Sequence, residues 1–184
     1  ELTHENMRRN AEVSAETLLL LTPGDTVLSG LPLFHSFGQT VAFNATIWAG
    51  GCLSLLNGFY PSWALEVIER DRPAGFIGVP TMYVALAQSG NQGRAAGSLR
   101  RCVSGGAALP VEVLRRFESQ FDCPILEGYG LSETSPVASF NHPNRERKPG
   151  SIGTPIAGVQ MRLLNDANAD VAPGEVGEIV VRGH

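Results

Sequence analysis

The sequence predicts an α/β fold in which a parallel sheet is flanked by helices, followed by part of a β-rich subdomain. From about residue 26, short runs that are apolar on both faces alternate with helical stretches. Such runs, each followed by a helix, are typical of buried parallel strands in a doubly wound layer. After about residue 150 the apolar residues alternate with period two, which favours an antiparallel hairpin. We therefore expect an α/β subdomain over 1–150 and an incomplete β-barrel portion over 151–184.

The elements of the first half follow in order. The chain opens on a helical stretch at ELTHENM, and TVLSGL is the first predicted strand. Residues 36–49 form a predicted helix, and CLSLL is the second strand. The segment PSWALEVIERD predicts a helix that starts near Pro61 and repeats apolar residues four apart, such as Trp63 with Val67.

Three more strands complete the predicted parallel sheet. GFIGVP precedes a helix from about residue 81, LRRCVSGG precedes the helix PVEVLRRFESQF, and CPILEGYG closes the series. Farther along, VQMRLL and GEVGEIVVRG predict the two strands of the hairpin. A lone hairpin is rarely stable, so we expect this subdomain to be incomplete.

Composition limits the class of protein. The chain has 184 residues, a net charge of −4 and 43% hydrophobic residues, which indicates a globular protein and argues against a nucleic-acid partner. Cys52, Cys102 and Cys123 form no CxxC motif and no even set, which favours a reducing, cytoplasmic compartment. We expect no transmembrane segment and no signal peptide. The missing initiator Met and the stop directly after a strand suggest a fragment of a larger protein.

Polar or glycine-rich segments follow four of the predicted strands. They are PLFHSFG, GVPTMY, SGGAALP and EGYGLSE. Because the carboxyl ends of parallel strands meet at one edge of the sheet, we expect these segments to form one site.

The segment EGYGLSET carries the most chemistry. Tyr129 stands between Gly128 and Gly130, so its ring could stack on a planar heterocycle while the glycines admit close backbone approach. Ser132 offers a hydroxyl for a phosphate oxygen, and Glu133 offers a carboxylate for Mg²⁺. A strand-to-helix turn, with Ser132 as a cap and Tyr129 in the core, is the alternative that the segment leaves open.

Other motifs narrow the choice. Thr134 stands where a nucleophile elbow needs its second glycine, which argues against a hydrolase. SGGAALP is neither the dinucleotide fingerprint nor a Walker phosphate loop. His35 and Phe37, beside Leu33 and Phe34, suit the mouth of a hydrophobic slot, although a lone histidine is more often structural.

Seven motifs together resemble the adenylate-forming enzymes, which include acyl-CoA synthetases, luciferase-like proteins and the adenylation domains of peptide synthetases. The resemblance covers essentially the whole chain and is greatest to bacterial long-chain fatty acid–CoA ligases. In family order the motifs are LTHEN, LPLFHSFG, GVPTMY, SGGAALP, GYGLSE, KPGSIGTP and GEVGEIVVRG.

The resemblance implies a reaction and a set of site residues. A fatty acid or other carboxylic acid attacks ATP bound with Mg²⁺, and coenzyme A then displaces AMP from the acyl-adenylate. Ser132, in place of the family's threonine, would bind the α-phosphate, and Glu133 would hold the metal. Tyr129 would stack on adenine. The implied nucleotide wall is completed by Gly105, Gly106, Ala107, Glu127 and Gly128, and the implied acyl pocket is bordered by His35, Phe37, Val79 and Gly130.

The family's phosphate loop, ribose-binding aspartate and C-terminal lysine are not in this sequence, so we expect the fragment alone to be inactive. Residues 33–43 contain no Asp or Glu, which disfavours an amino-acid substrate because its ammonium would lack a partner. An aryl-acid CoA ligase stays open. A non-catalytic nucleotide-binding or scaffold module is the alternative of another class. A lipid substrate would be compatible with peripheral membrane contact.

Overall fold

The computed structural model describes residues 1–90 and 97–183. Its main sheet has seven strands in the order β2-β1-β3-β4-β5-β6-β7, and the first five in sequence are parallel. The predicted parallel sheet is thus confirmed. The parallel strands are β1 (Thr26–Ser29), β2 (Cys52–Leu55), β3 (Gly75–Gly78), β4 (Arg101–Ser104) and β5 (Ile125–Gly130).

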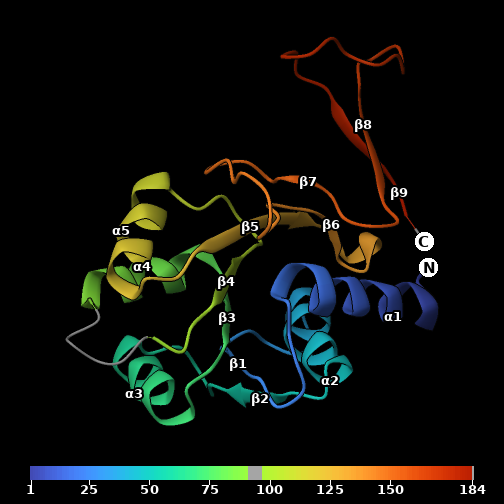
Figure 1. Cartoon of the computed structure of the whole chain (residues 1–184). Coiled ribbons are helices and arrows are strands. Elements are labelled where there is room, and N and C mark those ends of the chain that lie inside the picture. Colours follow the sequence, from blue (N-terminus) through green and yellow to red (C-terminus); the bar gives the residue numbers. More distant parts are fainter. Residues whose placement is uncertain (91–96, 184) are drawn as a thin grey trace.

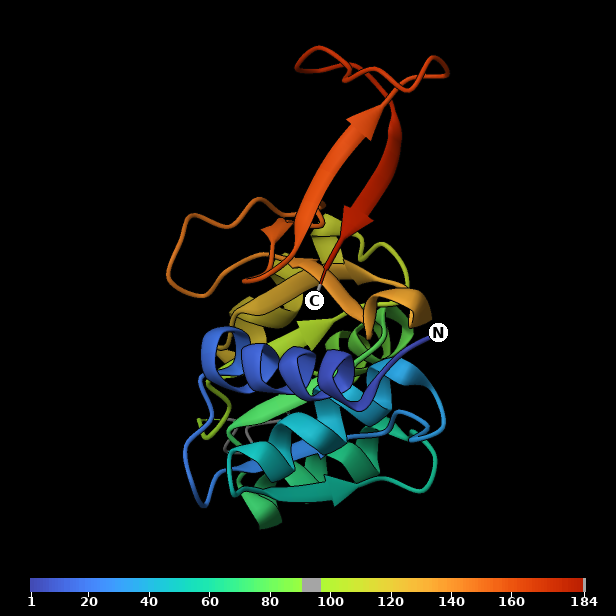
Figure 2. The ribbon, with the colours of Figure 1, turned by 90° about the vertical axis from the view of Figure 1, so that its right-hand side faces the viewer.

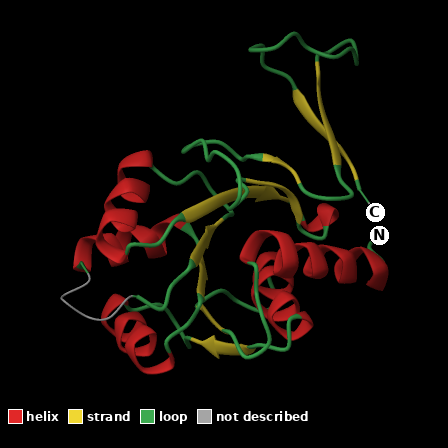
Figure 3. Ribbon diagram, in the orientation of Figure 1, coloured by secondary structure: helices red, strands yellow, loops and turns green. Residues whose placement is uncertain are grey.

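Helices cover both faces of this sheet (Figure 1 and Figure 3). One face carries α3 (Pro61–Asp71), α4 (Pro80–Ser89) and α5 (Val111–Phe121). The other carries α1 (His4–Val13) with η1 (Ser14–Leu19), and η2 (Gly38–Asn44) with α2 (Ala45–Trp48). The predicted helix over 36–49 is therefore present, but it is π-helical over its middle part.

Two short antiparallel strands extend the sheet beyond β5, and the sequence analysis did not predict them. They are β6 (Val137–Phe140) and β7 (Thr154–Pro155). β7 has only two residues, and β6, unlike the predicted parallel strands before it, is not followed by a long helix. β7 belongs to the large sheet but lies after residue 150, where we expected the first subdomain to end. The predicted division of the chain into subdomains over 1–150 and 151–184 stays a prediction.

The predicted hairpin is formed by β8 (Gln160–Leu164) and β9 (Glu178–Arg182). It forms a separate two-stranded sheet and projects away from the main body (Figure 2). Its strands are exposed or half-buried along their whole length.

An aromatic column lies under the sheet on the α3–α5 face. The rings of Phe76, Tyr83, Phe117 and Phe121 follow one another with centroids 4.3–5.2 Å apart, and all four are buried. The Tyr83 hydroxyl donates to the Val103 carbonyl oxygen at 2.8 Å, so the polar end of the ring is also satisfied. This core fixes β3, β4 and α5 beneath the edge that carries the site.

On the opposite face, α1 is tied to the segment that follows β5. Its first turn is capped by Thr3, whose hydroxyl accepts from Asn6 N. Farther along the helix, the fully buried Asn10 donates to the carbonyl oxygens of Thr134 and Val137 and accepts from Val137 N. The helix thereby holds both ends of the turn that leads into β6.

Candidate active site

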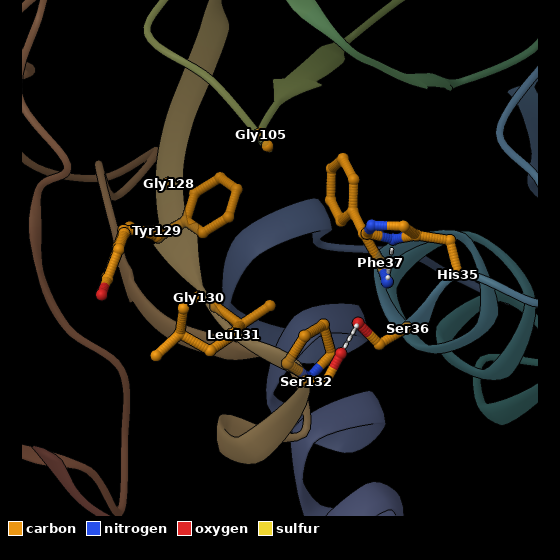
Figure 4. Close-up of a pocket in the computed structure, with 13 residues that line it drawn as sticks. His35, Ser36, Phe37, Gly105, Gly128, Tyr129, Gly130, Leu131 and Ser132 are labelled. Atoms are coloured by element: carbon orange, nitrogen blue, oxygen red, sulfur yellow. Dashed lines mark hydrogen bonds between the residues drawn. The ribbon is translucent and has the colours of Figure 1, made fainter.

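A pocket of about 270 Å³ lies at the carboxyl edge of the parallel sheet, where ligands bind in open α/β folds. Loops after β1, β4 and β5 meet there (Figure 4). Its lining residues are His35, Ser36, Phe37, Gly105, Gly106, Gly128, Tyr129, Gly130, Leu131, Ser132, Pro136, Val137 and Phe140. The structure thus brings together eight of the residues singled out in the sequence, drawn from three separate motifs.

Tyr129 and Ser132 lie on the β5 side of the pocket. Tyr129 is half-buried near the end of β5, and its ring projects from the strand (Figure 4). After Gly130 the chain turns into a single 3₁₀ turn over Ser132–Thr134. The Thr134 hydroxyl accepts from Leu131 N at 2.9 Å, which fixes the turn and leaves the Ser132 side chain exposed.

His35, Ser36 and Phe37 form the facing wall (Figure 4). The Nδ1 atom of His35 accepts from Phe37 N at 3.2 Å, which orients the imidazole at the start of the helix. The buried Phe37 ring lies against Gly105, where an added Cβ would be 3.1 Å from Cζ of the ring. The loop after β1 and the loop after β4 are therefore in direct contact.

The glycines beside Tyr129 also have a packing role, which the sequence alone did not indicate. A Cβ on Gly128 would lie 2.1 Å from Cε2 of Phe140, and one on Gly130 would lie 1.9 Å from the Pro136 carbonyl oxygen. These glycines make room for β6 and the turn before it. Because both also line the pocket, a ligand could still contact their backbone.

Four predicted site residues do not line this pocket: Val79, Ala107, Glu127 and Glu133. Val79 borders it indirectly, 3.6 Å from where a Cβ on Gly106 would stand, and Ala107 is exposed. Glu133 is exposed and lines a neighbouring pocket of about 200 Å³ between the N-terminus and the β8–β9 hairpin. The predicted roles of these residues in binding stay predictions.

Glu127 is turned toward the loop before β7. Its carboxylate accepts from Gly150 N at 2.9 Å, and the side chain is buried. Burial raises the pKa of Glu127, while the bond from Gly150 N and the charge of Arg147 partly offset that rise. In this position Glu127 supports the loop before β7.

Comparison with known proteins identifies the family to which the chain belongs. The family model described as "AMP-binding enzyme" matches residues 1–184. The chain belongs to the AMP-binding enzyme family. It is 38% identical over 185 residues to a long-chain-fatty-acid–CoA ligase of Bacillus subtilis, covering 99% of this chain and 33% of that protein. The chain therefore spans about a third of the length of this relative.

Solved structures of other AMP-binding enzymes have the same fold. A benzoate CoA ligase from Burkholderia xenovorans superposes with a TM-score of 0.91 at 30% identity, over 99% of this chain and 37% of that one. ATP-bound MatB from Rhodopseudomonas palustris superposes with a TM-score of 0.90, also at 30% identity, over 99% of this chain and 36% of that one. The fold, and membership in an adenylate-forming acid–CoA ligase family, are thereby established.

The sequence did not indicate five of the residues that line the pocket. Pro136, Val137 and Phe140 could not be placed, because β6 and the turn before it were not predicted. Ser36 and Leu131 lie inside motifs that had been recognised, but neither residue type alone indicates a ligand contact. For Ser36, the available signal was its position between His35 and Phe37.

Within the described part of the chain, no group of three or more His, Cys, Asp or Glu side chains could hold a metal ion. Mg²⁺, however, is usually bound by one or two carboxylates together with substrate phosphates and water. Glu133, exposed and next to Ser132, fits that mode of binding. No helix in residues 1–90 and 97–183 is long and apolar enough to cross a membrane.

Proposed function

We propose that the full-length protein activates a fatty acid with ATP and transfers the acyl group to coenzyme A. The observation that carries this proposal is the pocket itself, in which Tyr129 and Ser132 line the β5 side while His35 and Phe37 line the opposite side. The fold shared with ATP-bound MatB and the 38% identity to a fatty acid ligase support it.

The first step joins the acid to the nucleotide. A carboxylate oxygen attacks the α-phosphorus of ATP, the bond to the β-phosphate breaks, and pyrophosphate leaves. Tyr129 would position the adenine by stacking, and the Ser132 hydroxyl would donate to an α-phosphoryl oxygen as charge develops there. Glu133 would hold Mg²⁺, which supplies neutralisation of the phosphate charge when it is bound.

In the second step the sulfur of coenzyme A attacks the acyl carbonyl carbon. The bond to the phosphoryl oxygen breaks, AMP leaves, and a thioester is formed. The chain spans about a third of its relative's length, so we propose that the isolated chain does not catalyse either step.

The lining of the pocket favours an acid with an uncharged tail. None of its thirteen residues is Asp, Glu, Lys or Arg. The ammonium of an amino acid would have no partner there, and an unpaired buried charge is costly. A fatty acid is our first choice. An aryl acid is the alternative, and the structural likeness to a benzoate CoA ligase favours it.

ATP–pyrophosphate exchange by the full-length enzyme tests this function. We expect exchange that depends on fatty acids, with a lower kcat/KM for benzoate and none above background for amino acids. A clear optimum of kcat/KM for an aryl acid would make an aryl acid, in place of a fatty acid, the proposed substrate. Exchange that requires an amino acid would contradict the proposal.

A non-catalytic module is tested by Glu133→Gln in the same protein. An enzyme should lose magnesium-dependent exchange, whereas a scaffold shows no exchange in either form. If the Glu133→Gln enzyme keeps the same Mg²⁺ requirement as the wild type, Glu133 is not a metal ligand, and the proposed function is unaffected.

A further inference from the structure

Two hydroxyl groups meet across the pocket from opposite loops. Ser36 Oγ lies 3.4 Å from Ser132 Oγ, one from the loop after β1 and the other from the turn after β5 (Figure 4). Oxygens of a well-formed hydroxyl pair lie about 2.7–2.8 Å apart, so this contact is a loose one. Both hydroxyls are therefore able to donate to a third oxygen.

The two serines lie on different sides of the proposed reaction. Ser132 follows Tyr129 on the nucleotide side, while Ser36 lies between His35 and Phe37 on the acid side. In an acyl-adenylate, the acyl group and the nucleotide are joined through one phosphoryl group. A phosphoryl group held between these two loops would have its oxygens near both hydroxyls.

We propose that Ser36 is a second phosphoryl-binding residue, which donates to the same anionic oxygen as Ser132. This inference rests on the proposed function and adds a contact from the acid side. Hydrogen bonds to an ionised oxygen are about twice as strong as neutral ones, so a shared phosphoryl oxygen would replace the loose hydroxyl pair.

A purely structural role for Ser36 is poorly supported. Within residues 1–90 and 97–183, its hydroxyl has no hydrogen-bond partner other than Ser132 Oγ. Ser36 is half-buried and Ser132 is exposed, so Ser36→Ala strands no buried polar group. We therefore expect the variant to fold with an unchanged melting temperature.

The experiment measures AMP binding to the full-length protein by calorimetry. The variants are Ser36→Ala, Ser132→Ala, the double variant, and Ser36→Thr, which keeps the hydroxyl. Ser62→Ala, at an exposed serine in α3, is the matched control. We expect each single alanine variant to weaken AMP binding by roughly tenfold, which corresponds to one lost hydrogen bond to a charged group. Ser36→Thr and Ser62→Ala should bind like the wild type.

Sharing of one oxygen makes a second prediction. The loss in the double variant should differ from the product of the single losses, since coupled residues are non-additive. If the losses of AMP-binding free energy in the two single variants add up to the loss in the double variant, the proposal that both serines bind one oxygen would be overturned. Ser36→Ala binding AMP within about twofold of wild type, while Ser132→Ala is weakened, would overturn the role of Ser36 and leave the proposed function intact. Wild-type protein that does not bind AMP would overturn both.

Discussion

At the scale of single residues, the glycines on either side of Tyr129 are explained by packing within the protein. Gly128 faces the Phe140 ring and Gly130 faces the Pro136 carbonyl oxygen, each too closely for a Cβ. The sequence alone suggested a bare backbone around Tyr129, but it could not show that β6 fills the space. Their absent side chains shape the pocket indirectly, by letting β6 pack against β5.

Gly128→Ala should destabilise the protein strongly. The added Cβ overlaps a buried ring that is held between β5 and its neighbours, and such overpacking costs about 1–3 kcal/mol of unfolding free energy. Urea denaturation measures the effect. Gly97→Ala is the control, because nothing lies within 4 Å of its added Cβ. Equal stability of the two variants would contradict the packing account.

Glu127 makes a pH-dependent contribution to the stability of the folded protein. Its pKa is raised above the ordinary value of 4.5, chiefly by burial. A raised folded-state pKa gives stability that is fully present below the unfolded pKa and is lost as pH rises through the folded value. The wild type should therefore lose stability relative to Glu127→Gln as pH rises from about 4.5 toward neutrality.

Denaturation of both proteins across this pH range checks the sign. Asp71→Asn serves as a control of opposite direction. Hydrogen bonds from Arg70 and Ser54 lower the pKa of Asp71 to about 2, so its contribution is lost as pH falls. If the wild type became more stable relative to Glu127→Gln as pH rises, the pKa of Glu127 would not be raised in the folded protein, and the account of its burial would be contradicted.

At the scale of elements, α1 determines where the turn bearing Ser132 lies. The buried Asn10 side chain makes three hydrogen bonds to backbone atoms of Thr134 and Val137, which lie shortly after Ser132 in the chain. No sequence pattern indicated this contact, since 124 and 127 positions separate the partners. The local apolar periodicity predicted the helices and the parallel strands, while long-range polar contacts of this kind needed the structure.

Asn10→Asp should loosen this link. A carboxylate cannot donate to the Val137 or Thr134 carbonyl oxygens, and each buried group left unsatisfied costs about 1–3 kcal/mol. We expect a loss of about 2 kcal/mol or more in unfolding free energy at neutral pH, and weaker AMP binding through a displaced Ser132. Asn57→Asp, at an exposed loop position, should change neither quantity. An Asn10→Asp protein as stable as Asn57→Asp would refute the link.

At the scale of the whole molecule, the parallel sheet gathers loops that are far apart in sequence at one edge. The order of strands places β1 between β2 and β3, so the loop after β1 faces the loops after β4 and β5. The alternation of strands and helices predicted that these loops meet at one edge, where Tyr129, Ser132, His35 and Phe37 line one pocket, but it did not predict the order of the strands. The sequence did not predict that Glu133 lines the neighbouring pocket, because the direction of a side chain in a 3₁₀ turn depends on the local hydrogen bonds of that turn.

The central claim is that this edge of the sheet holds the adenylate, with Tyr129 against the base and Ser132 at the phosphate. A crystal structure of the full-length protein with AMP tests it most directly. We predict an adenine ring stacked on the Tyr129 side chain and a phosphate oxygen within hydrogen-bonding distance of Ser132 Oγ. AMP bound elsewhere, with the Tyr129 ring and the Ser132 hydroxyl both free of the nucleotide, would contradict the account.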